Sequence, residues 1–239
     1  MANHFFKFKQ FTVYQDQCAM KVCTDACLFG AWVVDYLKDN QPPSILDIGT
    51  GTGLLTMMLA QHCSAKIDAI EIEEGASAQA QFNFSQSPWE NQLQLIRRDV
   101  KEFNLNGGLG YHFIISNPPF YENDLPSPVQ NKNLALHSKA LTFKELIDCI
   151  SKLLNNDGQF AILVPYTRYQ YLIEEAAKAG FHVNKVTHVK QTTQHDFFRS
   201  MLIFSTNTHL AEENEISIKD HNEYTSTFKE LLSSYYLPF

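Results

Sequence analysis

Short apolar runs alternate along the chain with longer segments whose apolar residues recur every three or four positions. This alternation of strand-like and helix-like patterns is typical of a parallel sheet with helices on both faces. The pattern predicts seven strands, at residues 44–48, 66–72, 92–97, 111–116, 159–164, 181–190 and 198–205. It predicts helices between and after them, at residues 24–38, 53–62, 75–86, 142–154, 166–179 and 224–236.

The last two predicted strands are joined by residues 191–196, which show no helical pattern. We therefore expect these strands to pair as an antiparallel hairpin at one edge of the sheet. The predicted fold class is α/β, a doubly wound, mostly parallel seven-stranded sheet with an antiparallel edge hairpin. Because no repeat or linker divides the sequence, residues 1–239 are expected to form a single domain.

Of the 239 residues, 44% are hydrophobic, which is the composition expected of a soluble globular protein. No apolar run approaches the roughly 18 to 20 residues that cross a bilayer, and the N-terminus lacks the pattern of a signal peptide. A cytoplasmic location without a membrane partner is expected. The net charge of -7 argues against a protein that coats nucleic acid non-specifically, but it is compatible with a local basic patch.

Such a patch has two candidate regions. Residues 5–11 alternate aromatic and basic side chains, and further cations stand at Lys185, Lys190 and Arg199. These residues can follow a phosphate backbone while rings stack on bases. Residues 5–11 equally fit an amphipathic edge strand that its lysines keep soluble, so both interpretations remain open.

The five cysteines do not indicate a disulfide framework or a zinc site, because their number is odd and no Cys-x-x-Cys pair occurs. Cys23 and Cys27 lie one helical turn apart and can in principle share a metal ion. No histidine at ligand spacing accompanies them, so buried thiols are the favoured interpretation and no metal is expected.

A glycine-rich loop follows the first predicted strand and opens a helix. It carries Asp47, Gly49, Thr50, Gly51 and Gly53, which form the pattern Asp-x-Gly-x-Gly-x-Gly. The pattern differs from the Gly-x-Gly-x-x-Gly that wraps a pyrophosphate, and no lysine follows it to grip a phosphate. S-adenosylmethionine contains an adenosine and a charged amino acid but no phosphate, so this acidic loop fits that cofactor better than NAD.

Further candidates follow the next two strands. Glu71, with Ile72 beside it, ends the second strand at the spacing where an acid accepts from both ribose hydroxyls. Asp99 follows the third strand, where it can accept from the adenine amine while Val100 covers the ring; a helix cap is the alternative. Ligands of open α/β sheets bind at the carboxyl edge, so these residues are expected to share the cofactor site.

The fourth strand ends in Asn117, Pro118, Pro119 and Phe120. Two prolines fix their φ angles and remove two donors, so the strand ends in an exposed cluster of acceptors beside an aromatic ring. Asn117 Oδ1 and the Pro118 carbonyl can accept both hydrogens of a planar amine and make its lone pair available for attack, while Phe120 stacks on the substrate. A simple turn is the alternative interpretation.

With this motif, the chain resembles the Rossmann-like class I S-adenosylmethionine-dependent amino-methyltransferases whose catalytic motif is Asn-Pro-Pro-Tyr/Phe. Residues 8–11, 18–22, 24–25, 30–32, 78–81 and 86–89 further resemble the bacterial tRNA(Val) adenine-N6 methyltransferases. The resemblance implies methylation of N6 of adenine 37 in the anticodon loop of tRNA(Val). We expect the protein to act as a monomer. It also implies that residues 1–40 form a lid, with Lys21, Thr24 and Asp25 closing over the methionine end of the cofactor.

Other functions compatible with the motif remain open. A glutamine side chain of a release factor presents the same two amide hydrogens, and adenine in DNA or guanine in ribosomal RNA are further acceptors. A catalytically idle cofactor-binding or RNA-binding subunit is the alternative from a different class. His137 follows the motif and can contact substrate or serve as a surface or capping residue.

Overall fold

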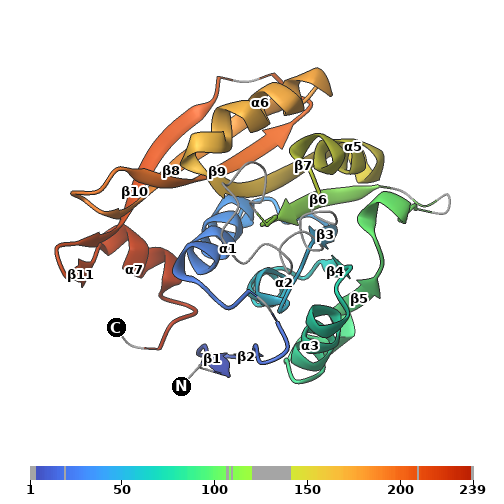
Figure 1. Ribbon diagram of the computed structural model, residues 1–239, viewed down its shortest axis with the longest axis horizontal. Helices are drawn as coiled ribbons and strands as arrows, with labels where there is room; N and C mark the ends of the chain where they lie inside the picture. The colour runs from blue at the N-terminus through green and yellow to red at the C-terminus, as the bar shows by residue number, and fades with distance from the viewer. Residues whose placement is uncertain are drawn as a thin grey trace, which may run out of the picture.

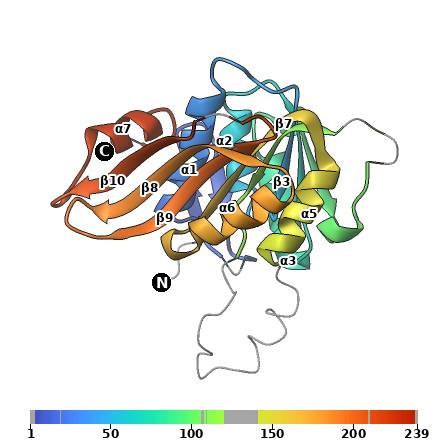
Figure 2. The same ribbon diagram turned by 90° about the horizontal axis from the view of Figure 1, so that it is seen from above.

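A sheet of nine strands runs through the described part of the molecule, with helices on both faces (Figure 1 and Figure 2). The computed structural model describes residues 4–18, 20–105, 108, 110–119, 141–208 and 210–237. The large sheet contains β3 (Ser44–Ile48), β4 (Lys66–Glu71), β5 (Leu93–Arg97), β6 (Tyr111–Ser116), β7 (Leu154–Pro165), β8 (His182–Thr192), β9 (Phe197–Ser205), β10 (Glu212–Asp220) and β11 (Glu223–Tyr224). A separate antiparallel hairpin consists of β1 (Phe5–Lys7) and β2 (Thr12–Tyr14).

The strands of the large sheet follow the order β11-β10-β8-β9-β7-β6-β3-β4-β5. Strands β3 to β7 are parallel, and β9 lies antiparallel between β7 and β8. The chain starts in the middle at β3, runs outward to β5 and returns to the other side of β3 with β6. The order therefore reverses between β3 and β6, which is where open α/β sheets bind ligands. The predicted doubly wound α/β fold is confirmed.

The sheet is wider than the seven predicted strands, because β10 pairs parallel with β8 and β11 pairs with β10. The antiparallel pairing of β8 with β9 is confirmed, but its predicted place at the edge is wrong since β10 covers β8. Only Ile216 and Ile218 of β10 are buried, and its first four residues are exposed and polar. No apolar pattern marks such a strand, because contacts with β8 rather than its own sequence hold it in place.

Helices form at all six predicted places, although the last one is shorter than expected. They are α1 (Thr24–Leu37), α2 (Leu54–Ala60), α3 (Glu74–Ser85), α5 (Phe143–Leu153), α6 (Tyr169–Lys178) and α7 (Ser226–Leu232). The first three and α7 pack on one face of the sheet through residues such as Phe29, Phe84 and Phe228. The other face is covered by α5 and α6 through residues such as Leu146 and Leu172.

Local signals in the sequence set the ends of two helices on that second face. Helix α5 begins at a capping box, in which the Thr142 hydroxyl accepts from Glu145 N and the Glu145 carboxylate accepts from Thr142 N. Helix α6 ends before Gly180, whose φ of +82° closes the last turn. Phe181 N then donates to Ala176 O at 3.0 Å, as in a Schellman C-cap.

Residues 5–11 belong to the small hairpin and not to an edge of the large sheet. Phe8 and Phe11 are buried and stack with ring centroids 4.5 Å apart. Lys7 is exposed, while Lys9 Nζ donates to Ser233 O near the other end of the chain. Aromatic burial therefore anchors this stretch on the core. Strand β1 is an edge strand of a two-stranded sheet with Lys7 exposed, so the edge-strand interpretation is confirmed for residues 5–7.

The segment after this hairpin lies across α3. Asn83 Oδ1 accepts from Tyr14 N at 3.0 Å, and Asn83 Nδ2 donates to Tyr14 O at 2.9 Å. Gln17 N donates to Gln79 Oε1 at 3.1 Å. Gly75 allows the Gln17 carbonyl to lie close to the start of α3, because a Cβ at this position would be 2.9 Å from Gln17 O. Helix α3 thus positions the N-terminal segment beside the end of β4.

Candidate active site

The glycine-rich loop between β3 and α2 is held against β4. Gly49 N and Thr50 N both donate to Ile70 O, at 2.9 and 3.1 Å. A Cβ at Gly49 or Gly51 would meet nothing within 4 Å, although both residues have positive φ. Gly53 differs, because a Cβ there would lie 2.4 Å from the Phe84 ring. The loop therefore presents open space at its first two glycines and packs tightly on α3 at the third.

Asp47 lies under this loop and is fully buried. Its Oδ2 accepts from the hydroxyls of Thr50 and Thr56, each at 2.7 Å. Its Oδ1 is buried and has no hydrogen-bond partner within the described ranges. Burial raises the pKa of Asp47 to about 6, although the two hydroxyls oppose this shift. A buried carboxylate oxygen is therefore available to a donor at the loop.

Glu71 joins the loop to the start of α3. Its Oε2 accepts from Gly51 N at 2.9 Å and its Oε1 accepts from Glu73 N at 2.9 Å. Ile72 follows directly and leaves 44% of its surface exposed. The structure thus brings Glu71, Ile72 and the glycine loop together, as the sequence predicts. An exposed isoleucine beside a buried acid is suited to a flat ring linked to a sugar.

Asp99 serves as an N-cap. Its Oδ1 accepts from Lys101 N at 2.9 Å at the start of the 3-10 turn Val100–Glu102. Its side chain is 27% exposed, and Val100 beside it is buried. The capping alternative is thus confirmed, while contact of Asp99 with an adenine amine stays a prediction.

Asn117 directly follows β6. Ser116 Oγ donates to Ile48 O at 2.8 Å, which fixes the end of β6 against β3. Asn117 Oδ1 is buried, and none of the described residues donates a hydrogen bond to it. Pro118 is buried and Pro119 is half-buried. The prediction that these acceptors are exposed is therefore wrong for Asn117 Oδ1, which packing at the end of β6 buries, while its role in holding an amine stays a prediction. Phe120 and His137 lie outside the described residues.

Helix α1 begins with Thr24 and Asp25. Its N-cap residue is Cys23, and Lys21 and Thr24 are exposed. Asp25 Oδ2 accepts from Arg199 Nε of β9 at 2.7 Å. The sequence analysis missed this pair because the two residues lie far apart in the chain.

The cations of β8 and β9 do not form an open basic surface. Each lies within ion-pair distance of a carboxylate, namely Lys185 of Glu212 at 3.2 Å, Lys190 of Glu215 at 3.3 Å and Arg199 of Asp25 at 2.7 Å. The basic patch considered for this region is therefore largely neutralised by neighbouring acids.

No group of three or more His, Cys, Asp or Glu side chains in the described ranges can hold a metal ion. Cys27 is buried as expected, but Cys23 is exposed. No helix among the same residues is long and apolar enough to cross a membrane.

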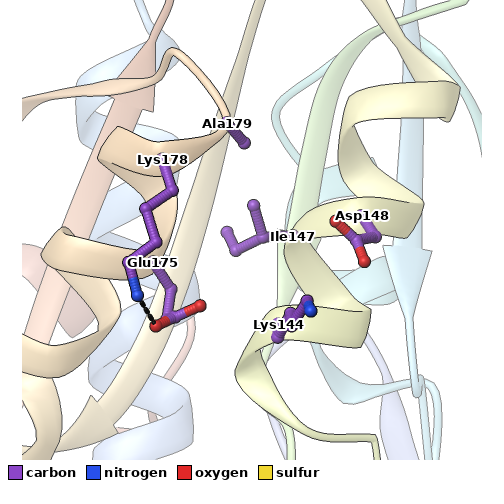
Figure 3. A pocket seen from close by; sticks show the side chains of 6 residues that line it. All are labelled: Lys144, Ile147, Asp148, Glu175, Lys178 and Ala179. Atoms are coloured by element: carbon purple, nitrogen blue, oxygen red, sulfur yellow. Dashed lines mark hydrogen bonds and ion pairs between the residues drawn. The ribbon is translucent and has the colours of Figure 1, made fainter.

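A surface hollow of about 240 Å³ lies between α5 and α6 (Figure 3). It is lined by Lys144, Ile147, Asp148, Glu175, Lys178 and Ala179, and Lys178 is paired with Glu175 (Figure 3). None of these residues was expected in the site, and the hollow shares no residue with the glycine loop or the end of β6.

Two further residues support the site without having been predicted. Thr56, in the first turns of α2, donates to Asp47. Asn83 donates to Thr52 O at 2.8 Å as well as binding Tyr14, so it connects the glycine loop to the N-terminal segment. The only sign of either role in the sequence is that Thr56 and Asn83 are polar residues at core-facing positions of helices, where a polar side chain needs a hydrogen-bond partner.

The sequence matches the family described as the methyltransferase small domain over residues 30–198. The chain belongs to this family. A protein of Dyadobacter fermentans named tRNA1(Val) (adenine(37)-N6)-methyltransferase is 42% identical over 99% of this chain and 99% of its own length. One of the same name from Flavobacterium psychrophilum is 39% identical over 97% of this chain and 99% of its own. The resemblance inferred from the motifs is confirmed.

Solved methyltransferase structures share the fold at low identity. A predicted O-methyltransferase from Agrobacterium tumefaciens superposes with a TM-score of 0.65 and 16% identity, covering 88% of this chain and 96% of that chain. This similarity supports the Rossmann-like architecture alone.

Proposed function

We propose that this methyltransferase transfers a methyl group from S-adenosylmethionine to the N6 amine of adenine 37, beside the anticodon of tRNA(Val). The names of the relatives support this substrate, because the similarity extends over almost the whole chain. The observation that carries the proposal is Asn117 Oδ1, a buried acceptor without a partner in the described residues. It lies at the end of β6, where the strand order reverses.

The described residues fit S-adenosylmethionine, which when bound supplies an electrophilic methyl group on a sulfonium. In this proposal, Glu71 accepts from the ribose hydroxyls and Asp47 Oδ1 accepts a hydrogen bond at the methionine end. Exposed Ile72 and buried Val100 line the adenine, whose amine donates to Asp99. The open Gly49, Thr50 and Gly51 backbone allows close approach without a phosphate-binding lysine.

Catalysis in this proposal depends on how Asn117 and Pro118 hold the acceptor amine. The lone pair of an exocyclic amine is delocalised into the base, so the amine is a weak nucleophile. Hydrogen bonds to Asn117 Oδ1 and the Pro118 carbonyl favour the pyramidal geometry of the transition state over the planar ground state. Pro119 stiffens the corner and Phe120 stacks on the base. The methylated nitrogen then releases its proton to water, so no general base is needed.

The same proposal gives the N-terminal residues 1–40 the role of a lid within a single domain. Lys21, Thr24 and Asp25 would close over the methionine end of the cofactor, with Asp25 next to its ammonium group. Arg199 already binds Asp25, so the ammonium would join an existing ion pair. We propose that the protein acts as a cytoplasmic monomer on the anticodon loop, where extruding a base costs less than in a duplex.

The experiment offers the purified protein a labelled methyl donor together with three separate acceptors. These are total tRNA, genomic DNA and total protein, each from cells that lack the enzyme. We expect label in tRNA alone, recovered as N6-methyladenosine from tRNA(Val) at position 37. Label confined to protein would identify a glutamine methyltransferase, and label in none of the pools would contradict a methyltransferase of these substrates.

A further inference from the structure

Aromatic rings gather where β7 ends and β9 begins. The Tyr166 centroid lies 5.2 Å from that of Tyr169, with the planes 26° apart, and 5.1 Å from that of Phe197. His188 is buried against them, with its centroid 5.0 Å from Tyr166 and 4.8 Å from Tyr169. Tyr166, Tyr169 and Phe197 are themselves half-buried, so part of each is open to solvent. We call these four residues the aromatic platform.

The aromatic platform lies beside the predicted catalytic corner. Strand β7 lies beside β6 (Figure 1). The two strands pair in parallel, with Ile162 opposite Ser116. Tyr166 comes four residues after Ile162, and Pro119 three residues after Ser116, so both follow neighbouring strand ends on one edge of the sheet. A single strand bound along this edge of the sheet can therefore place one base at the end of β6 and a neighbouring base on the aromatic platform.

Hydrogen bonds fix the histidine on which the rings pack. His188 Nδ1 lies 2.9 Å from Ser200 Oγ, and Nε2 lies 3.3 Å from Glu213 Oε1. With both nitrogens engaged, the imidazole holds the tyrosine rings edge-on, at 85° and 69° to its plane. The aromatic platform is thus formed before any substrate binds, which lowers the entropy lost on binding.

The cations near the rings are engaged within the protein. Lys190 Nζ lies 4.5 Å from the Phe197 centroid and 3.3 Å from Glu215 Oε2. The Arg168 guanidinium lies 4.9 Å from the centroid of Tyr171, outside the aromatic platform. The half-exposed rings therefore carry the inference, because aromatic side chains are the surfaces on which the bases of a single-stranded nucleic acid stack.

We propose that Tyr166 stacks on the base next to the methylated adenine in the single-stranded loop of the RNA. This inference rests on the proposed function and assigns a substrate contact outside the Asn117 motif. Tyr166 would then act in substrate binding and positioning, while Asn117 acts on the reacting amine. Loss of the ring should weaken RNA binding and leave cofactor binding unchanged.

The test measures binding of unmodified tRNA(Val) transcript by Tyr166→Ala, Tyr166→Phe and a control, Tyr171→Ala. Tyr171 is an exposed tyrosine of α6 that lies outside the aromatic platform. We expect Tyr166→Ala to raise the dissociation constant and KM for tRNA about tenfold or more, with kcat changed less than threefold. Tyr166→Phe keeps the ring, so it should remain within twofold, as should Tyr171→Ala. Equal affinity for S-adenosylmethionine in all three verifies that each variant is folded.

A second arm identifies the stacked base. Transcripts with an abasic site at position 36 or 38 should bind the unchanged protein about tenfold more weakly at one of the two positions. Tyr166→Ala should bind the transcript that lacks this base as tightly as the unchanged protein does, because the ring and the base contribute to affinity only together. The inference would be overturned if Tyr166→Ala and the abasic sites weakened binding independently at both positions. It would also be overturned if Tyr166→Ala bound tRNA within twofold of the unchanged protein. In either case, methylation of tRNA by the unchanged protein would still support the proposed function. No methylation of tRNA by the unchanged protein would reject both.

Discussion

Buried polar groups are left unpaired in one half of the sheet and mostly paired in the other. At the ends of β3 and β6, Asp47 Oδ1 and Asn117 Oδ1 are buried without a partner in the described residues. Such an atom costs about 1–3 kcal/mol of folding free energy unless a ligand binds it. Two of them beside a glycine-rich loop therefore make this part of the described structure a candidate ligand site.

The other half of the sheet contains a ladder of opposite charges between β8 and β10. Lys185 faces Glu212, and Lys190 lies diagonally across from Glu215. The hydroxyl of Thr187 is an exception there, since it is buried without a partner in the described ranges. The acids hold β10 on the sheet and cancel the positive charge that a phosphate backbone would need. Unpaired acceptors thus distinguish the candidate site, whereas Lys185 and Lys190 of the other half are paired with acids of β10.

Asn117→Ala should have the largest effect. Removing the acceptor that acts in the transition state should lower kcat by about 10²- to 10³-fold. The dissociation constant of S-adenosylmethionine should stay within a few fold, because we assign cofactor binding mainly to residues that follow β3 and β4. Steady-state methylation and calorimetric binding measure the two quantities, with exposed Asn214→Ala on β10 as the control. Normal turnover of Asn117→Ala would show that the unpaired acceptor at the end of β6 has no role in catalysis, and the contrast between the two halves of the sheet would lose its functional meaning.

Glu71→Ala should come next. It removes the carboxylate that binds Gly51 N and that we assign to the ribose, so cofactor affinity should fall about 100-fold. Glu74→Ala alters an acid only three residues away that is paired with Arg97 on the surface, and it should bind normally. Calorimetric titration with S-adenosylmethionine compares the two. Equal affinity of both variants would exclude Glu71 from the cofactor site.

Asp47→Asn should change the pH dependence of stability. Because burial raises the pKa of Asp47 above that of the unfolded chain, the folded state binds the proton more tightly. The free energy of unfolding should therefore fall as pH rises from about 4 to 6, by about 1–3 kcal/mol from this group.

Asparagine at position 47 cannot ionise, so Asp47→Asn should be more stable than the unchanged protein at pH 7 by about that amount, with the difference vanishing near pH 4. Urea unfolding at both pH values measures it, and Asp148→Asn on the surface of α5 serves as the control. If the difference in unfolding free energy between Asp47→Asn and the unchanged protein did not depend on pH, burial would not raise the pKa of Asp47 as we infer.

Breaking the charge ladder should have the smallest effect. A double-mutant cycle of Lys185→Gln and Glu212→Gln should give a coupling of about 0.5 kcal/mol, because Glu212 is largely exposed. The affinity for tRNA should change less than about twofold in either variant. A much larger loss of tRNA affinity in Lys185→Gln would show that this lysine binds the substrate despite its pairing with Glu212.

Strong local signals allowed most of the fold to be predicted. Buried strands such as β3 and β6 are nearly continuous apolar runs, and α5 begins at a capping box that its own residues complete. Strand β10 gave no such signal. Its charged residues are stable only opposite β8, so their arrangement depends on a partner far away in the sequence.

For the candidate site, the sequence allowed the shared position of its residues to be predicted. Asp47, Glu71 and Asn117 lie at or just after the ends of neighbouring parallel strands, because residues that end parallel strands share one edge. The ion pair of Asp25 with Arg199 and the link from Asn83 to the glycine loop could not be inferred from spacing. Spacing also gave no indication that the Gln17 carbonyl lies so close to Gly75 that a Cβ there would be 2.9 Å from it.

The sequence by itself thus determined the α/β architecture, the glycine-rich loop and the motif that ends β6, since all three follow from local periodicity and turn chemistry. Only the tertiary structure decided which of the polar atoms remain unpaired and which cations are neutralised. Hydrogen bonds and ion pairs of this kind join residues that are distant in the chain, and their geometry is fixed only when the sheet and its helices pack together.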